Sequence, residues 1–201
     1  KAVEQAGVKR VVHLSSIGAH TDKGTGSLYL HNMVENILRQ LPDDVAINFM
    51  RPVGFFTNLF RGMENIKTKG TIMSTYGGDK KEPWVSPLDI AAVIAEEIES
   101  PFEGKTARYI ASDEVSPNEI AQVLGNAIGN PSLKWMVVPD EQMHKGMLDM
   151  GMNAWIANGF IQMQAAQRDG SLYADFYRNK PTLGKVKLAD FAKEFAIAYN
   201  K

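Results

Sequence analysis

Hydrophobic and polar residues follow a strand, helix, strand order over the first 58 residues of the chain. Val8–Leu14 is a β-branched run that predicts a strand, and Val45–Met50 predicts a second strand that ends at Arg51-Pro52. Between them, Tyr29–Leu41 has apolar residues at helical spacing, which predicts a helix. Two parallel strands joined by a helix place both strand ends at one edge of a sheet, where the ligands of open α/β sheets lie.

After residue 58 the apolar spacing alternates between helix and strand patterns, and it then becomes mostly helical. Ser86-Pro87 and Ser116-Pro117 each predict a helix start, with Ser as the N-cap and Pro at the first helical position. Residues 140–168 are helical in pattern and rich in Met, and Leu188–Tyr199 predicts a closing amphipathic helix. We therefore expect an α/β domain over residues 1–111 and a small, mostly helical lobe over residues 112–201.

Composition and charge narrow the classes of function. With 44% hydrophobic and 22% charged residues, the 201-residue chain has an ordinary globular composition. A net charge of −1 gives no basic surface field, so we expect no direct contact with nucleic acid. Cysteine is absent, which removes disulfides and is compatible with the cytoplasm, the location we expect. No apolar run approaches the ~20 residues of a membrane span, and the four His residues lack metal-ligand spacing, so we expect neither membrane nor metal.

Four motifs in order carry a resemblance to a known family. They are the run from Ala6 to Gly18, His31-x-x-x-Glu35, Arg51-Pro52-x-x-Phe55-x-x-Asn58, and Trp84-Val85-Ser86-x-x-Asp89-Ile90-Ala91. Together they resemble the NmrA-like group of atypical short-chain dehydrogenases. The resemblance implies a Rossmann-like doubly wound parallel sheet that binds NADP or NAD, with NADPH slightly preferred, and a helical substrate lobe.

The function implied by the resemblance is NAD(P)H-dependent hydride transfer to a quinone-like or carbonyl small molecule. The alternative is a non-catalytic NAD(P) sensor that acts through a regulatory protein partner, and a homodimer is a further candidate assembly. The usual Tyr-x-x-x-Lys pair is missing, because the corresponding helix carries Ser27 and His31. A literal match at Tyr76–Lys80 contains two glycines that disfavour a helix, so we interpret it as a decoy.

A Gly-rich turn that would bind the pyrophosphate of a dinucleotide is also missing. Gly24-Thr25-Gly26 has no third glycine at the required spacing, and no helix pattern follows Gly77-Gly78. Lys1–Gly7 reads as the last turns of a helix closed by Gly7. We therefore expect that an N-terminal half of roughly 70–100 residues, enough for two or three βα units, precedes residue 1.

Ser15, Ser16 and His31 are the candidate site residues on the first strand and helix. The resemblance makes Ser15 a cofactor contact and Ser16 a catalytic residue that contacts substrate or nicotinamide, although small polar residues often simply end a strand. His31 stands where the family keeps its helix-borne Lys, so it is expected to bind the nicotinamide ribose and to assist proton delivery. A surface or core histidine is the alternative.

The other expected cofactor contacts follow the second strand: Pro52, Val53, Gly54, Phe55 and Asn58. Pro52 ends the strand and fixes the backbone, and Gly54 allows close approach of a ligand. Phe55 and Phe56 are expected to cover the nicotinamide ring. Asn58 is expected to cap the next helix or to contact ligand. The alternative for this segment is a hydrophobic lid over the core.

Overall fold

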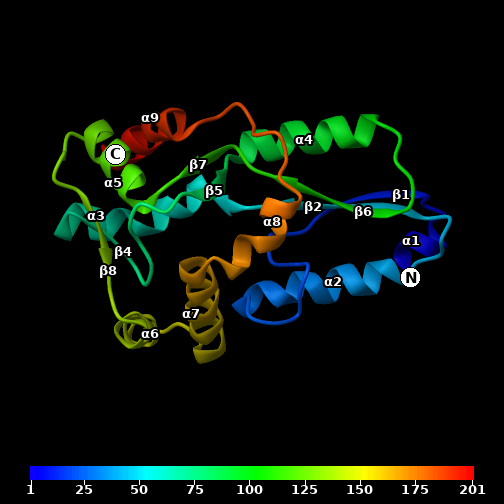
Figure 1. Ribbon diagram of the computed structural model, residues 1–201, viewed down its shortest axis with the longest axis horizontal. Coiled ribbons are helices and arrows are strands. Elements are labelled where there is room, and N and C mark those ends of the chain that lie inside the picture. The colour runs from blue at the N-terminus through cyan, green and yellow to red at the C-terminus, as the bar shows by residue number, and fades with distance from the viewer.

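The computed structural model describes residues 1–201, with an α/β sheet at one end and a helical lobe at the other (Figure 1). The sheet is parallel, in the order β1-β2-β6, with strands Arg10–Leu14, Ala46–Pro52 and Lys105–Ile110. Helix α2 (Tyr29–Arg39) lies on one face of this sheet and helix α4 (Pro87–Glu99) lies on the other. This arrangement confirms the predicted Rossmann-like architecture.

The side chains of β2 show why helices cover both faces of the sheet. Asn48 Nδ2 donates to Glu97 Oε1 of α4 at 2.6 Å, whereas the ring of Phe49 lies under the guanidinium of Arg39 in α2, 4.5 Å from its Cζ. Successive side chains of a strand point to opposite faces, so β2 is buried on both. A strand of this kind reads as a near-continuous apolar run, which in β2 is interrupted by Asn48.

Two smaller sheets continue the fold toward the lobe. Strand β5 (Glu82–Val85) pairs parallel to β3 (Gly54–Phe55) and antiparallel to β7 (Asp113–Val115). Strand β4 (Thr71–Ser74) pairs parallel to β8 (Lys134–Val137). The predicted division after residue 111 stays a prediction, and the β4–β8 pairing crosses it.

The helix starts that the sequence predicts are confirmed by their caps. Ser116 Oγ accepts from the backbone N–H of Glu119 at 3.1 Å, and the Glu119 carboxylate accepts from the Ser116 N–H at 2.7 Å. Ser86 Oγ accepts from the N–H of Leu88 at 3.2 Å. The helices besides α2 and α4 are α1 (Ala2–Gln5), α3 (Met63–Lys69), α5 (Pro117–Ala127), α6 (Asp140–Asp149), α7 (Ala154–Asp169), α8 (Ala174–Arg178) and α9 (Leu188–Tyr199), and 3₁₀ turns form at Gly26–Leu28 (η1), Phe56–Gly62 (η2) and Ser171–Tyr173 (η3). None of the helices combines the length and apolar character that a membrane span needs.

Two glycines, Gly26 and Gly159, allow the backbones of η1 and α7 to pack closely against each other. A Cβ added to Gly26 would lie 1.9 Å from the carbonyl oxygen of Gly159, and one added to Gly159 would lie 3.0 Å from Ser27 Cβ. Gly26 also has a φ of 57°, which side-chain-bearing residues rarely adopt. The start of α2 therefore packs backbone to backbone against α7, as Figure 1 shows.

Candidate functional site

The predicted ligand edge of the sheet forms where β1 and β2 end. The backbone N–H of Ser15 donates to the carbonyl oxygen of Met50 at 2.7 Å, and that of Ile17 donates to Pro52 O at 2.9 Å. These bonds continue the parallel pairing past the last strand residues, so Ser16 lies beside the segment that starts at Pro52. The structure thus brings together the two polar clusters that the sequence singles out.

Ser15 is held by the protein itself. Its side chain is buried and its hydroxyl donates to Glu35 Oε1 of α2 at 2.6 Å. A cofactor contact from Ser15 would therefore have to come from its backbone. Ser16 is half-buried and stands outside this hydrogen-bond network, which leaves its hydroxyl available to a ligand.

Glu35 is the centre of a buried ionic network below the strand ends. Its side chain accepts from Arg51 Nε at 2.9 Å and from Arg51 Nη2 at 2.6 Å. Arg51 Nη1 lies 3.6 Å from Asp175 of α8, and the hydroxyl of Tyr109 donates to the same carboxylate at 2.7 Å. Burial alone would raise the pKa of Glu35, but the hydrogen bonds from Arg51 and Ser15 hold it below its ordinary value. The network ties α2, β2, β6 and α8 together.

The sequence motifs contain Glu35 and Arg51 but do not show this pairing. Asp175 and Tyr109 were not among the candidates, and no local pattern could have found them, because they come from β6 and α8, 66 residues apart. They can be recognised only in the folded structure, where each places a polar side chain near the buried Arg51.

His31 lies one helical turn before Glu35, half-buried at the side of the sheet that α2 covers. Burial lowers its pKa below the ordinary value, His13 acts in the same direction, and Glu35 opposes them. The imidazole is therefore neutral near pH 7 and can donate or accept one hydrogen bond without adding a positive charge. A role for His31 in binding the ribose stays a prediction, and its neutral imidazole does not reproduce the cation that a Lys would place there.

The residues from Pro52 to Asn58 fall into two groups: some lie at the sheet edge, and others are buried in the core. A Cβ added to Gly54 would lie 3.8 Å from the Trp84 ring, so the side-chain side of this half-buried glycine faces the indole. Phe55 is half-buried beside it, whereas Val53 and Pro52 are buried. The Pro52 carbonyl already accepts from Ile17 and the Val53 N–H donates to Ile110 O at 3.1 Å, so the carbonyl of Val53 is the backbone group left for a cofactor.

Two expectations for this segment are wrong. Phe56 is fully buried and stacks between Trp84 and Phe191, with centroid distances of 6.0 and 5.4 Å, so it belongs to the lobe core and cannot cover a nicotinamide ring. Asn58 caps no helix, because it lies exposed inside η2 and α3 begins only after Gly62. A ligand contact from Asn58 stays a prediction.

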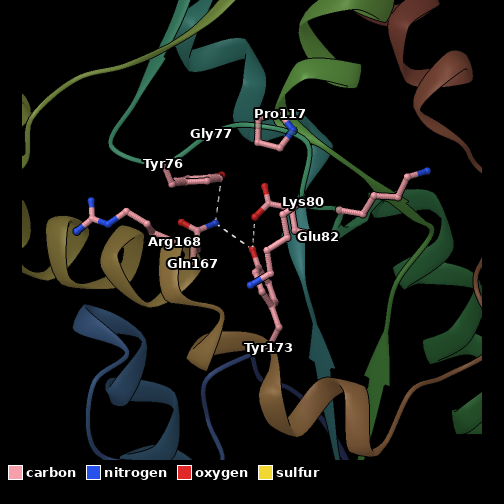
Figure 2. Close-up of a pocket in the computed structure, with 9 residues that line it drawn as sticks. Tyr76, Gly77, Lys80, Glu82, Pro117, Gln167, Arg168 and Tyr173 are labelled. Atoms are coloured by element: carbon pink, nitrogen blue, oxygen red, sulfur yellow. Dashed lines mark hydrogen bonds between the residues drawn. The ribbon is translucent and has the colours of Figure 1, made fainter.

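The decoy interpretation of Tyr76–Lys80 is confirmed to the extent that this segment is not helical. Tyr76 nevertheless lines a pocket with Glu82, Gln167 and Tyr173 (Figure 2). The hydroxyl of Tyr173 donates to Glu82 Oε2 at 2.7 Å, and Gln167 Nε2 donates to both tyrosine hydroxyls at 3.2 Å. The sequence gives no signal for this cluster, since Glu82 and Tyr173 are 91 residues apart.

Comparison with known proteins identifies the fold. No protein-family model matches the sequence, and no curated protein matches it. Among solved structures, an NADPH-dependent quinone oxidoreductase from Escherichia coli matches with a TM-score of 0.78 and 18% identity, over 96% of this chain and 70% of that one. A nucleoside-diphosphate-sugar epimerase from Staphylococcus aureus matches with a TM-score of 0.73 and 17% identity, over 96% of this chain and 67% of that one.

A third similar structure is the triphenylmethane reductase from Citrobacter sp., with a TM-score of 0.69 and 17% identity, over 98% of this chain and 68% of that one. The chain therefore has the Rossmann-like α/β fold that these reductases and this epimerase share. Identities this low show the fold alone. The chain spans about two thirds of the length of each of these proteins.

Proposed function

We propose that the chain carries the nicotinamide and substrate side of an NAD(P)H-dependent oxidoreductase that acts on a quinone-like or carbonyl small molecule. The observation that carries the proposal is the edge where β1 and β2 end, with the Ser16 hydroxyl outside the hydrogen-bond network and beside the segment that starts at Pro52. The quinone oxidoreductase and the triphenylmethane reductase have also been solved with NADPH and NADP(H), respectively, which supports NADP(H) as the cofactor.

The residues at this edge fit a nicotinamide. Gly54 and Phe55 would hold the ring, and a neutral His31 would donate to a ribose hydroxyl. The bound cofactor would supply the hydride. The hydroxyl of Ser16 would donate a hydrogen bond to the substrate carbonyl oxygen, and the Ser15–Glu35 contact would fix the strand end from which Ser16 projects.

A titration with NADPH tests the proposal. Ligand-observed NMR suits it, because the chain lacks a Gly-rich pyrophosphate turn and we expect weak binding. Replacing His31 by Ala should weaken binding about 2- to 12-fold, the value of one hydrogen bond, whereas His31→Lys should largely preserve it. His144→Ala on α6 is the matched control. No detectable NADPH binding, or equal binding by the His31→Ala and His144→Ala variants, would refute the assigned site.

A second candidate function is a dinucleotide sensor that acts through a protein partner. Ser27 replaces the usual tyrosine and packs against Gly159, so this position offers no phenol as general acid. The outer face of α2 carries an exposed apolar stripe at helical spacing: Leu30, Met33, Val34 and Ile37. A sensor predicts NADPH binding without quinone turnover, together with an association that Ile37→Lys abolishes in sedimentation. Turnover by the Ile37→Lys variant would favour the enzyme.

A further inference from the structure

We propose that the pocket between the β4–β5 loop and the end of α7 binds the carboxylate group of a small acid, between the ammonium of Lys80 and a protonated Glu82 (Figure 2). The pocket has a volume of about 40 Å³. One water needs about 10–15 Å³ by the same measure, so the space accepts about three non-hydrogen atoms. A carboxylate group has three.

Glu82 lines this space and carries a buried polar atom without a hydrogen-bond partner. Its side chain is 4% exposed, and one oxygen is engaged by the Tyr173 hydroxyl while Oε1 has no hydrogen-bond partner. In the protonated carboxyl, Oε1 carries an O–H that needs an acceptor. An oxygen of a bound carboxylate is such an acceptor, and the bond between an acid and a carboxylate is charge-assisted.

Protonation of Glu82 near neutral pH follows from its surroundings. Burial raises its pKa to about 7, against the hydrogen bond from Tyr173, the nearby Tyr76 phenol and Trp84 indole, and the charge of Lys80. The other group that faces this carboxyl from a packed element is the phenol of Tyr177 on α8. Lys80 is the charged group that acts most strongly on Glu82, and the protonated form is well populated at pH 7.

The rim of the pocket offers one cation that is not already paired. Lys81 Nζ lies 3.2 Å from Glu119 Oε1, and Arg168 Nη1 lies 2.8 Å from Asp140 Oδ1. In Figure 2 the guanidinium of Arg168 points away from the cluster. Lys80 Nζ is close to Gly170 at the end of α7, where an added Cβ would lie 2.5 Å from it. Lys80 makes no ion pair within 4 Å, although its charge lowers the pKa of the nearby Asp169, so its ammonium can still attract an anion.

Formate is the probe, because it is the smallest carboxylate and stays ionised between pH 5.5 and 8.5. Trp135 reports on the pocket, since its indole N–H donates to Tyr76 O at 2.7 Å. We expect formate, compared with chloride at equal ionic strength, to shift the Trp135 indole NMR signal, which Trp135→Phe identifies. The affinity should fall about tenfold per pH unit above pH 7, because one proton is bound together with formate.

Three variants separate the contributions of Lys80, Lys81 and Glu82 to formate binding. Lys80→Met should weaken formate binding at least tenfold, whereas Lys81→Met should leave it unchanged. Glu82→Gln, which carries a permanent N–H donor, should bind formate with no dependence on pH. Thermal unfolding confirms that each variant is folded.

Three results would overturn the proposal: no formate binding at pH 6, equal binding by the Lys80→Met and Lys81→Met variants, or an unchanged pH dependence in Glu82→Gln. Binding of methylammonium in place of formate would also overturn it, because Glu82 would then act as an anion. None of these measurements needs NADPH, so the outcome is independent of the proposed oxidoreductase.

Discussion

Replacing Glu35 by Gln should remove the charge that balances the most deeply buried arginine of the fold. Glu35 is 1% exposed and Arg51 is 7% exposed, and two hydrogen bonds of 2.9 and 2.6 Å join them. Gln preserves the shape of the side chain but not its charge. The guanidinium of Arg51 would keep Asp175, at 3.6 Å, as its remaining counter-ion.

The expected loss of stability is about 3 kcal/mol. Removing one partner of a buried ion pair costs about 3–5 kcal/mol, because the other charge stays buried without compensation. We expect the lower end, since Asp175 still compensates part of the charge of Arg51. The surface pair Lys145–Asp149 has a similar distance of 3.1 Å, but both of its side chains are exposed. Asp149→Asn should therefore cost no more than about 0.5 kcal/mol.

Urea unfolding at pH 7, followed by tryptophan fluorescence, measures both losses. The midpoint should fall in Glu35→Gln with an unchanged m value, because the surface exposed on unfolding stays the same. A Glu35→Leu, Arg51→Met double variant should recover much of the loss, since it removes both buried charges. A loss below about 1 kcal/mol for Glu35→Gln, or a double variant no more stable than it, would refute the reasoning.

The same variant has a defined pH signature. The lowered pKa of Glu35 stabilises the wild type above the ordinary value of 4.5, and this stabilisation is lost as the pH falls through the lower folded-state pKa. Glu35→Gln lacks this ionisation. Its difference from the wild type should therefore shrink in acid and be largest above pH 4.5.

Two further predictions concern other sites. For Glu82, the folded-state pKa of about 7 lies above the ordinary 4.5, so wild-type stability should fall as the pH rises between these values. Glu82→Gln should remove this decline and be more stable than the wild type at pH 8 by up to about 3 kcal/mol, and parallel pH profiles in urea unfolding would contradict it. Gly159→Ala should cost about 1–3 kcal/mol by forcing α7 away from Ser27. Gly146→Ala in the open surroundings of α6 should instead gain up to about 1 kcal/mol, and equal melting temperatures of the two would argue against the close packing.

Local signals were enough to predict much of the fold. The runs Val8–Leu14 and Val45–Met50 predicted β1 and β2. The Ser-Pro pairs predicted the starts of α4 and α5, because a cap depends on residues three or four positions apart. Strands β3, β5 and β7 were not predicted. Each has two to four residues, which is too short to show a period of two, and each is held by pairing with a distant strand.

Helix α2 shows that apolar periodicity predicts a helix without predicting which face of it is buried. Its apolar spacing predicted a helix, yet the apolar stripe that includes Met33 and Ile37 is exposed, and the helix buries Glu35. The spacing sets only the angle between side chains, and the partner decides which stripe turns inward. Here the inward stripe is polar because Arg51, on β2, offers Glu35 two hydrogen bonds and a countercharge that repay its desolvation.

The same reasoning applies to Ser15 and Ser16, to which the resemblance assigns different roles. Along β1, His13 faces the side of the sheet that α2 covers, where its ring lies 6.0 Å from that of Phe49. Ser15, two residues further, points the same way and reaches Glu35. Ser16 follows beyond the end of β1, where it is half-buried, and its hydroxyl makes no hydrogen bond within the protein. Which of the two hydroxyls the protein engages therefore depends on the position of Glu35, which lies 20 residues further along the chain in α2.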